Sequence, residues 1–254
     1  MFKIDNKIKL FAFDLDGTIY IDNKLVPGVI ELLSFLKDRY QVIFFTNNSS
    51  KTTTQTHEKL NNLGVKCKLN EVYTSSSATV SYLSEAGIDN LYVIGSNEFC
   101  EEIKGQGLKV VDADSAENLV VGLDFDLNYD KIAKALTVLL KGGKFIACNK
   151  DRSFPIGNNS YLPGCGAIVG AITGSSNKEP DYIIGKPNTY ILQKISDKFK
   201  VNNNEMVIVG DSYESDIIMA QNYNCKSILI SKNNKSNNRI LVVEDIKDII
   251  KKIR

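Results

Sequence analysis

Residues 11–18 read Phe11-Ala-Phe-Asp-Leu-Asp-Gly-Thr18, an apolar run that ends in two aspartates and a glycine. A short apolar run that stops at a glycine predicts a buried strand whose carboxyl end opens into a turn. Residues i and i+2 of a strand point to the same side, so we expect Asp14 and Asp16 to project together. Neighbouring carboxylates repel each other unless a cation or a chemical task holds them in place.

Two plainer interpretations apply to this stretch. A calcium-binding EF-hand loop that began at Asp14 would need glycine at its sixth position and glutamate at its twelfth. Those positions hold Ile19 and Leu25, which excludes the EF-hand. A simple polar turn after a core strand remains open from this stretch alone, and the rest of the chain decides between it and a functional site.

The composition limits the class of protein. The chain has 254 residues, 43% of them hydrophobic, and a net charge of +1, which is enough apolar content for one large core or two moderate ones. The interspersed charges and the lack of an apolar run of about 18 residues argue against nucleic-acid and membrane partners. The first residues lack a signal-peptide pattern, and five scattered cysteines indicate free thiols, so we expect a cytoplasmic protein.

Strand and helix patterns alternate along most of the chain. Strands are predicted at 9–15, 41–46, 72–74, 91–94, 108–111, 119–123, 144–148, 182–184, 206–209 and 227–230, with a hairpin over 18–26. Helices are predicted at 27–38, 52–63, 78–86, 98–104, 129–140, 189–199, 213–221 and from 243 onward. This alternation predicts an α/β fold with a parallel sheet covered by helices on both faces.

Polar residues follow four of the predicted strands. They are the pair Asp14 and Asp16, and the segments 46–48 (Thr-Asn-Asn), 185–187 (Gly-Lys-Pro) and 210–216, which begins Gly-Asp and ends in Asp. Ligands of open α/β sheets bind outside the carboxyl ends of the strands. We therefore expect these four segments, which are far apart in sequence, to meet at one edge of one sheet.

The order of these segments resembles the phosphatases of the haloacid dehalogenase superfamily, whose four motifs are all present. The segments 46–49 (Thr-Asn-Asn-Ser), 185–187 and 162–167 (Leu-Pro-Gly-Cys-Gly-Ala) further resemble the NagD-like branch, with its p-nitrophenylphosphatases, nucleotide phosphatases and phosphoglycolate phosphatases. The resemblance implies a doubly wound, Rossmann-like parallel-sheet core with an inserted, smaller α/β cap of the large C2 type. The core would comprise 1–78 and 180–254, and the cap 79–179.

The resemblance also implies catalytic roles. Asp14 would be the nucleophile that forms an aspartyl-phosphate, and Asp16 the general acid and base. A carboxylate can approach a phosphate only if charge is offset, which Mg²⁺ does with hard oxygen ligands. Its implied ligands are the Asp14 carboxylate, the Asp16 backbone carbonyl and Asp211, with Asp216 in or just behind that shell.

Further residues would bind the substrate. By resemblance, Thr46, the backbone of Asn47 and Lys186 would hold the phosphate oxygens, as phosphoryl transfer requires donors and positive charge there. A loop formed by residues Asn149, Asp151 and Arg152 would lean over the active site and contact the leaving group. The family's usual threonine before this loop is Cys148 here, so a plain polar turn also remains open.

Competing motifs fail at single positions. A Walker A loop would need glycine at Pro180 or Val138, and a Rossmann glycine motif would need it at Val169. A cysteine phosphatase would need arginine at Ala171, so Cys165 is interpreted as a structural residue in a tight turn. The only histidine, at position 57, is expected to be a partly exposed surface residue.

The sequence therefore predicts a Mg²⁺-dependent phosphomonoesterase for a small phosphorylated metabolite: a nucleotide, a sugar phosphate, phosphoglycolate or p-nitrophenyl phosphate. A dehalogenase would need neither Asp16 nor Asp211, and a catalytically silent sensor or scaffold would be expected to carry a broken motif. A phosphotransferase would differ by excluding water, which a sequence does not reveal. The physiological substrate and the oligomeric state, a homo-oligomer included, stay open.

Overall fold

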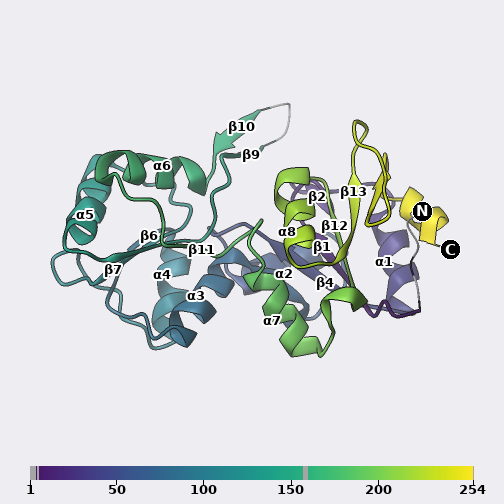
Figure 1. Cartoon of the computed structure of the whole chain (residues 1–254), viewed down its shortest axis with the longest axis horizontal. Helices are drawn as coiled ribbons and strands as arrows, with labels where there is room; N and C mark the ends of the chain where they lie inside the picture. Colours follow the sequence, from purple (N-terminus) through teal and green to yellow (C-terminus); the bar gives the residue numbers. More distant parts are fainter. Residues whose placement is uncertain (1–3, 5, 157–159, 254) are drawn as a thin grey trace. The chain divides into compact units, whose positions relative to one another are not determined.

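The computed structural model describes residue 4 and residues 6–156 and 160–253 (Figure 1). The chain forms two compact units. The first comprises Met1–Thr46, His57–Tyr73 and Lys186–Arg254, and the second comprises Asn47–Thr56 and Thr74–Gly185. The segment 79–179 lies within the second unit, which also includes residues 47–56 and extends to Gly185.

The first unit is built on a six-stranded sheet. Its strands lie in the order β14 (Ile240–Val243), β13 (Lys226–Ile230), β12 (Met206–Gly210), β1 (Leu10–Asp14), β4 (Gln41–Thr46) and β5 (Val72–Thr74). The pairs from β14 to β4 are parallel. Chain order runs outward from β1 to β5 on one side and from β12 to β14 on the other, which is the doubly wound arrangement. The predicted α/β parallel-sheet fold is confirmed.

The topology brings distant strand ends together. The order reverses between β1 and β12, where ligands of such sheets bind beyond the carboxyl ends. Asp14, the last residue of β1, is in register with Phe45, and Phe13 is in register with Val209. Thr46 and Gly210, which end β4 and β12, therefore lie at the same edge as Asp14.

The central strands form the core of the first unit. Every residue of β1 and β12 is buried, as expected for parallel strands covered on both faces. One face carries Phe11, Phe13 and Phe44, which pack with the apolar stripe of α1 (Val29–Lys37) and with α9 (Asp248–Ile253). The unit also contains α7 (Tyr190–Phe199), α8 (Ile218–Asn222) and the hairpin of β2 (Tyr20–Ile21) and β3 (Lys24–Leu25). Helix α2 (Thr53–Asn62) crosses the unit boundary at residue 56.

The second unit has a smaller parallel sheet. Its strands lie in the order β11 (Tyr182–Ile183), β8 (Lys144–Ala147), β7 (Asn118–Val121) and β6 (Leu91–Ile94). The helices are α3 (Ser75–Glu85), α4 (Asn97–Gly105), α5 (Tyr129–Leu140) and α6 (Cys165–Ser176). Apolar residues of α5 and α6 pack in one cluster with residues of β7 and β8. A hairpin of β9 (Ser153–Pro155) and β10 (Tyr161–Pro163) precedes α6.

Three predictions of secondary structure are wrong. The segment 108–111 forms only an isolated bridge between Val110 and Leu91, because a turn at Asp112 follows at once. Val243 ends the strand β14 instead of starting a helix, since a short apolar run does not distinguish a strand from a buried helix. Cys165 is not in a tight turn: it begins α6, whose glycines resemble a loop in sequence but whose Ile168, Val169 and Ile172 are buried.

Other sequence predictions agree with the structure. All five cysteines, which lie within the described residues, are free thiols. His57 is partly exposed, and its Nε2 lies 2.9 Å from the carbonyl oxygen of Cys67. Among the described residues, none of the helices is both long and apolar enough to span a bilayer.

Candidate active site

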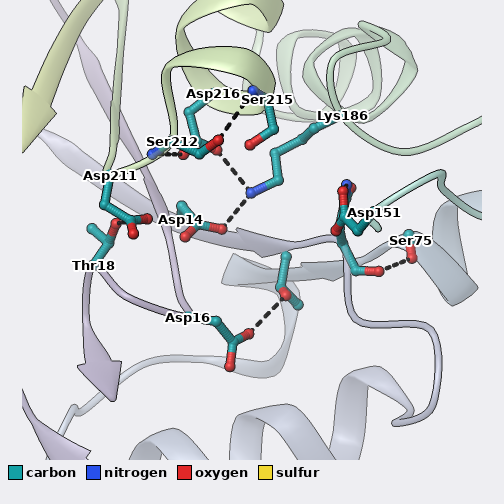
Figure 2. Close-up of polar contacts among 12 residues, drawn as sticks. Asp14, Asp16, Thr18, Ser75, Asp151, Lys186, Asp211, Ser212, Ser215 and Asp216 are labelled. Atoms are coloured by element: carbon teal, nitrogen blue, oxygen red, sulfur yellow. Dashed lines mark hydrogen bonds and ion pairs between the residues drawn. The ribbon is translucent and has the colours of Figure 1, made fainter. Parts of the chain in front are cut away.

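A buried lysine links two aspartates at the carboxyl edge of the large sheet. The Nζ atom of Lys186 lies 2.5 Å from Oδ1 of Asp14 and 2.8 Å from Oδ1 of Asp216, as Figure 2 shows. All three side chains are at most 6% exposed. Breaking such a buried pair would leave a charge without compensation, so these three groups depend on one another.

The electrostatics of this cluster are unbalanced toward negative charge. Burial alone would lower the pKa of Lys186, but the two carboxylates in contact raise it above its ordinary value, so the ammonium stays charged. Burial raises the pKa of Asp14 well above its usual range, and the charges of Asp216 and Asp211 add to that rise against the effect of Lys186. One ammonium does not neutralise three carboxylates, so the cluster would be stabilised by a further cation.

Three carboxylates provide the donors for such a cation. Oxygen atoms of Asp14, Asp211 and Asp216 all lie within 4.8 Å of one another. Crowding by surrounding protein atoms and the charge of Asp216 raise the pKa of Asp211. The hydroxyl of Thr18 donates to Oδ1 of Asp211 over 3.2 Å, which orients that carboxyl group. Hard oxygen donors of this kind fit Mg²⁺, which commonly binds to one or two carboxylates and keeps several waters.

Two glycines make room for these carboxylates. A Cβ atom at Gly17 would lie 2.3 Å from Oδ2 of Asp211, and one at Gly210 would lie 2.2 Å from Oδ2 of Asp216. Gly17 also has a φ of +91°, a conformation that glycine adopts without strain. Both glycines of the sequence motifs are therefore required by close approach of an acidic side chain to the backbone.

A π-helical turn places Asp216. The segment Tyr213–Ile217 is a π-helix that leads into α8, where the sequence predicted a single α-helix over 213–221. The hydroxyl of Ser212 accepts from the backbone N–H of Ser215, and the N–H of Ser212 donates to Oδ2 of Asp216 over 3.1 Å. Such π-turns are frequent at functional sites. Here the turn directs the buried Asp216 back toward the end of β12.

Asp16 has different surroundings from Asp14. Strand β1 ends at Asp14, so the turn after it, not strand alternation, sets the direction of Asp16. The carboxyl group of Asp16 is exposed and accepts a hydrogen bond of 3.2 Å from the hydroxyl of Thr46. Figure 2 shows the two carboxyl groups directed to different partners. One aspartate is thus fixed in a charged cluster, and the other is exposed to solvent beside Thr46.

Sequence reasoning missed one residue near Asp16. Burial raises the pKa of the Tyr20 hydroxyl above its ordinary value, and the charge of Asp16 and a hydrogen bond to it add to the rise. The ammonium of Lys59 lies 3.7 Å from the centre of the Tyr20 ring. In the sequence, Tyr20 looks like an ordinary aromatic residue of a hairpin, and no motif distinguishes it.

The remaining predicted residues lie in the second unit. Oδ1 of Asp151 accepts a hydrogen bond of 2.9 Å from the side chain of Asn47. The amide of Asn149 donates to the carbonyl oxygen of Asn47 over 2.7 Å, and Asn149 is buried. Arg152 is exposed, and its carbonyl oxygen accepts from the backbone N–H of Gly164. The three loop residues are therefore not equivalent: Asn149 is internal, whereas Arg152 faces solvent.

Comparison with known proteins identifies the family. A sequence model of the haloacid dehalogenase-like hydrolases matches residues 11–109, and a second model, of HAD-hydrolase-like proteins, matches residues 183–252. The acid sugar phosphatase of Staphylococcus haemolyticus is 33% identical over 223 residues, which cover 87% of this chain and 84% of that protein. This chain belongs to the haloacid dehalogenase-like hydrolases.

Solved structures of haloacid dehalogenase-like hydrolases place it within a branch. The crystal structure of 4-nitrophenylphosphatase from Thermotoga maritima superimposes with a TM-score of 0.90 at 31% identity, covering 98% of each chain. NagD from E. coli K-12 superimposes with a TM-score of 0.83 at 27% identity, covering 92% of this chain and 96% of NagD. The expected resemblance to the NagD and p-nitrophenylphosphatase branch is confirmed.

Proposed function

We propose that this chain is a Mg²⁺-dependent phosphomonoesterase that hydrolyses a small phosphorylated metabolite through an aspartyl-phosphate intermediate on Asp14. The observation that carries the proposal is the contact of Lys186 with Asp14 and Asp216, beside Asp211. It provides a buried nucleophile, a fixed positive charge and donors for a cation. The names of its relatives, acid sugar phosphatase and 4-nitrophenylphosphatase, support the same reaction class.

Asp14, the backbone carbonyl of Asp16 and Asp211 would hold Mg²⁺, with Asp216 as a further ligand or directly behind them. Their oxygen chemistry and the excess of negative charge both favour a divalent cation. When bound, Mg²⁺ would offset the negative charges of the nucleophile and the phosphoryl group. Lys186 would then be less engaged by Asp14 and more available to a phosphate oxygen.

In the first half of the reaction, a carboxylate oxygen of Asp14 forms a bond to phosphorus while the bond from phosphorus to the ester oxygen breaks. Asp16 donates its proton to that leaving oxygen, which departs as an alcohol. In the second half, Asp16 accepts a proton from water, and the water oxygen attacks the phosphorus of the aspartyl-phosphate. Phosphate leaves and Asp14 is restored. The exposure of Asp16 suits a group that must exchange protons twice in each cycle.

The phosphate oxygens would be held by the hydroxyl of Thr46, the backbone N–H of Asn47 and the ammonium of Lys186. Lys186 supplies a point charge where negative charge spreads over the equatorial oxygens in the transition state. Its raised pKa keeps the ammonium charged over the pH range in which the enzyme would act. These groups recognise phosphate alone and therefore serve every substrate in the same way.

We further propose that the second unit acts as a cap, in line with the predicted segment 79–179. Asp151 and Arg152, with Asn149 behind them, would contact the part of the substrate that is not phosphate, which is where nucleotides, sugar phosphates, phosphoglycolate and p-nitrophenyl phosphate differ. Contacts to that part orient the phosphate for reaction. A cytoplasmic location is part of the proposal and is supported by five free thiols.

A phosphate-release screen tests this function. The purified chain is assayed against nucleotides, sugar phosphates, phosphoglycolate and p-nitrophenyl phosphate, each with Mg²⁺, with excess EDTA, and after Mg²⁺ is restored. We expect release that is lost in EDTA and recovered with Mg²⁺, and that is absent in an Asp14→Asn variant under all conditions. Full turnover in EDTA, or equal turnover by Asp14→Asn, would contradict the proposal.

A further inference from the structure

The backbone carbonyl of Asn47 is held by two buried side chains of the second unit. Oγ of Ser75 donates to this oxygen over 2.6 Å, and Nδ2 of Asn149 donates to it over 2.7 Å. Ser75 is fully buried and Asn149 is 3% exposed. We call Ser75 and Asn149 the Asn47 cradle. A carbonyl oxygen has two lone pairs, so these two donors occupy both and fix the plane of the peptide that follows Asn47.

The cradle satisfies its own hydrogen-bonding groups. Nδ2 of Asn149 also lies 3.5 Å from Oγ of Ser75, and Oδ1 of Asn149 accepts from the backbone N–H of Asp151 over 3.1 Å. A buried polar network is rigid when each member is paired. The amide of Asn149 is therefore engaged inside the unit, which favours a structural task over direct contact with a substrate.

The segment before Lys186 packs on the same residues. A Cβ atom at Gly185 would lie 2.5 Å from Oδ1 of Asn47 and 2.9 Å from Cβ of Asn149. The backbone N–H of Gly185 also donates to the carbonyl oxygen of Cys148 over 2.7 Å. Asn47 follows Thr46 directly in the chain, and Gly185 directly precedes Lys186. Two residues proposed to bind phosphate are thus each one peptide bond from a residue fixed at the cradle.

We infer that Ser75 and Asn149 are positioning residues for phosphate binding, acting through the backbone of Asn47. The inference rests on the proposed function, in which the N–H of Asn47 is a phosphate ligand. The carbonyl of Asn47 lies in the peptide after this residue and its N–H in the peptide before it, so the cradle acts on the N–H through the Cα of Asn47. With one cradle donor removed, both peptides gain alternative orientations, and the affinity for the phosphate group falls. Because phosphate is common to all substrates, the loss is the same whatever the leaving group.

The experiment compares Ser75→Ala and Asn149→Ala with a matched control, Ser76→Ala. Ser76 is also buried and lies next to Ser75 in α3, but its hydroxyl donates to the carbonyl oxygen of Lys51 instead. For each protein, the inhibition constant of inorganic phosphate, kcat and KM are measured with two esters of different leaving group, together with the melting temperature. The two Ser→Ala variants remove the same atom from neighbouring buried positions.

We expect Ser75→Ala and Asn149→Ala each to raise the inhibition constant of phosphate about 5- to 30-fold, the effect of losing one buried hydrogen bond. KM should rise by a similar factor for both esters, while kcat changes less. Ser76→Ala should leave the phosphate constant within about twofold of wild type, even at an equal loss of melting temperature. An Asn149→Asp variant, which keeps the shape but replaces the donor with an oxygen, should behave as Asn149→Ala does.

Three results would overturn the inference. If an active wild-type enzyme and a folded Ser75→Ala variant bind phosphate equally, the cradle has only a structural role. The same conclusion follows if Ser76→Ala weakens phosphate binding as much as Ser75→Ala does. If Asn149→Ala affects one ester and not the other, Asn149 reads the leaving group instead. A wild type that neither binds phosphate nor hydrolyses any ester would contradict the proposed function itself, which is distinguishable from these three results. Should one of the two alanine variants fail to fold, the other one decides.

Discussion

Two polar clusters of this molecule differ in the charge they carry. In the first unit, the ammonium of Lys186 contacts the buried Asp14 and Asp216, and the exposed Asp211 lies beside these two carboxylates. In the second unit, Ser75 and Asn149 surround the carbonyl of Asn47 with neutral donors. Both clusters are formed by residues far apart in sequence, yet only the first has an excess of one charge.

The difference indicates different tasks. Burying carboxylates whose charge is only partly compensated costs free energy of folding. The same burial raises the pKa of Asp14. In the proposed function, a bound cation would offset that cost, which makes the cluster suited to binding a phosphate group. A neutral cluster with its groups paired has no such imbalance, and it fixes a backbone segment instead. Substitutions in the two clusters should therefore fail in different ways.

The largest effect is expected for Asp14→Asn. The amide keeps the shape but is not a nucleophile, so kcat/KM should fall by about 10⁴-fold or more for every ester. Steady-state kinetics with p-nitrophenyl phosphate measure the loss, and circular dichroism verifies the fold. The variant also removes negative charge from the cluster, so its melting temperature should stay equal to or above that of wild type. Retention of more than a hundredth of the activity would place the nucleophile elsewhere.

Lys186→Met should have the next largest effect. Methionine keeps the length of the buried side chain but removes the charge that contacts both aspartates and that is proposed to bind phosphate. We expect kcat/KM to fall about 10²- to 10³-fold for all substrates alike. The loss also leaves Asp14 and Asp216 uncompensated, so the variant should melt lower than wild type without metal. Added Mg²⁺ should raise its melting temperature more than that of wild type. A selective loss for one substrate, or no extra response to Mg²⁺, would count against this description.

Gly210→Ala tests the close approach of Asp216. The added Cβ would lie 2.2 Å from Oδ2 and 2.6 Å from Cβ of Asp216, so the carboxylate must move. A displacement of about 1 Å at a catalytic group can reduce activity about 10²-fold, and we expect that loss here. Gly170→Ala is the control, because α6 leaves open space at Gly170. The control should keep full activity and gain about 0.5–1 kcal/mol in the free energy of unfolding. Equal activity of the two variants would contradict the geometry.

Asp151→Ala should have the smallest effect on catalysis and the most uneven one. Its carboxylate accepts a hydrogen bond from the side chain of Asn47, whereas the cradle holds the backbone carbonyl of that residue. We expect kcat/KM to fall about tenfold for the best metabolite substrate and less for p-nitrophenyl phosphate, since one pocket contact discriminates by that order. A panel of esters measures the spread. A uniform decrease across the panel would assign Asp151 to phosphate binding with the cradle.

The sequence predicted the charged cluster better than the neutral one. Asp14, Thr46 and Gly210 each end a strand, and the rule that parallel strands end at one edge brings them together without knowledge of side-chain packing. Local signals did not reveal Ser75, because α3 begins earlier than its apolar pattern suggested. Its bond to Asn47 joins residues 28 positions apart, and no periodicity encodes that contact.

Other differences between the predicted and the observed structure have similar physical causes. The strand Ile240–Val243 and the start of a helix share the same short apolar run, and pairing with β13 decides between them. Helix α6 carries glycines that disfavour a helix, and burial of Val169 and Ile172 overrides that preference. The position of Asp16 outside β1 depends on the turn that contains Gly17, which a rule of strand alternation does not describe.

The most direct test of the account is to trap the phosphorylated residue. The enzyme is mixed with Mg²⁺ and excess substrate, quenched in acid during turnover, and treated with borohydride, which reduces an aspartyl-phosphate to homoserine. Peptide mass spectrometry then locates the reduced residue. We expect homoserine at position 14, which should not form when hydroxylamine treatment precedes the borohydride, and which should be absent from the Asp14→Asn variant. Homoserine at Asp16 or Asp211, or steady turnover of a wild type in which no reduced residue is found, would contradict it.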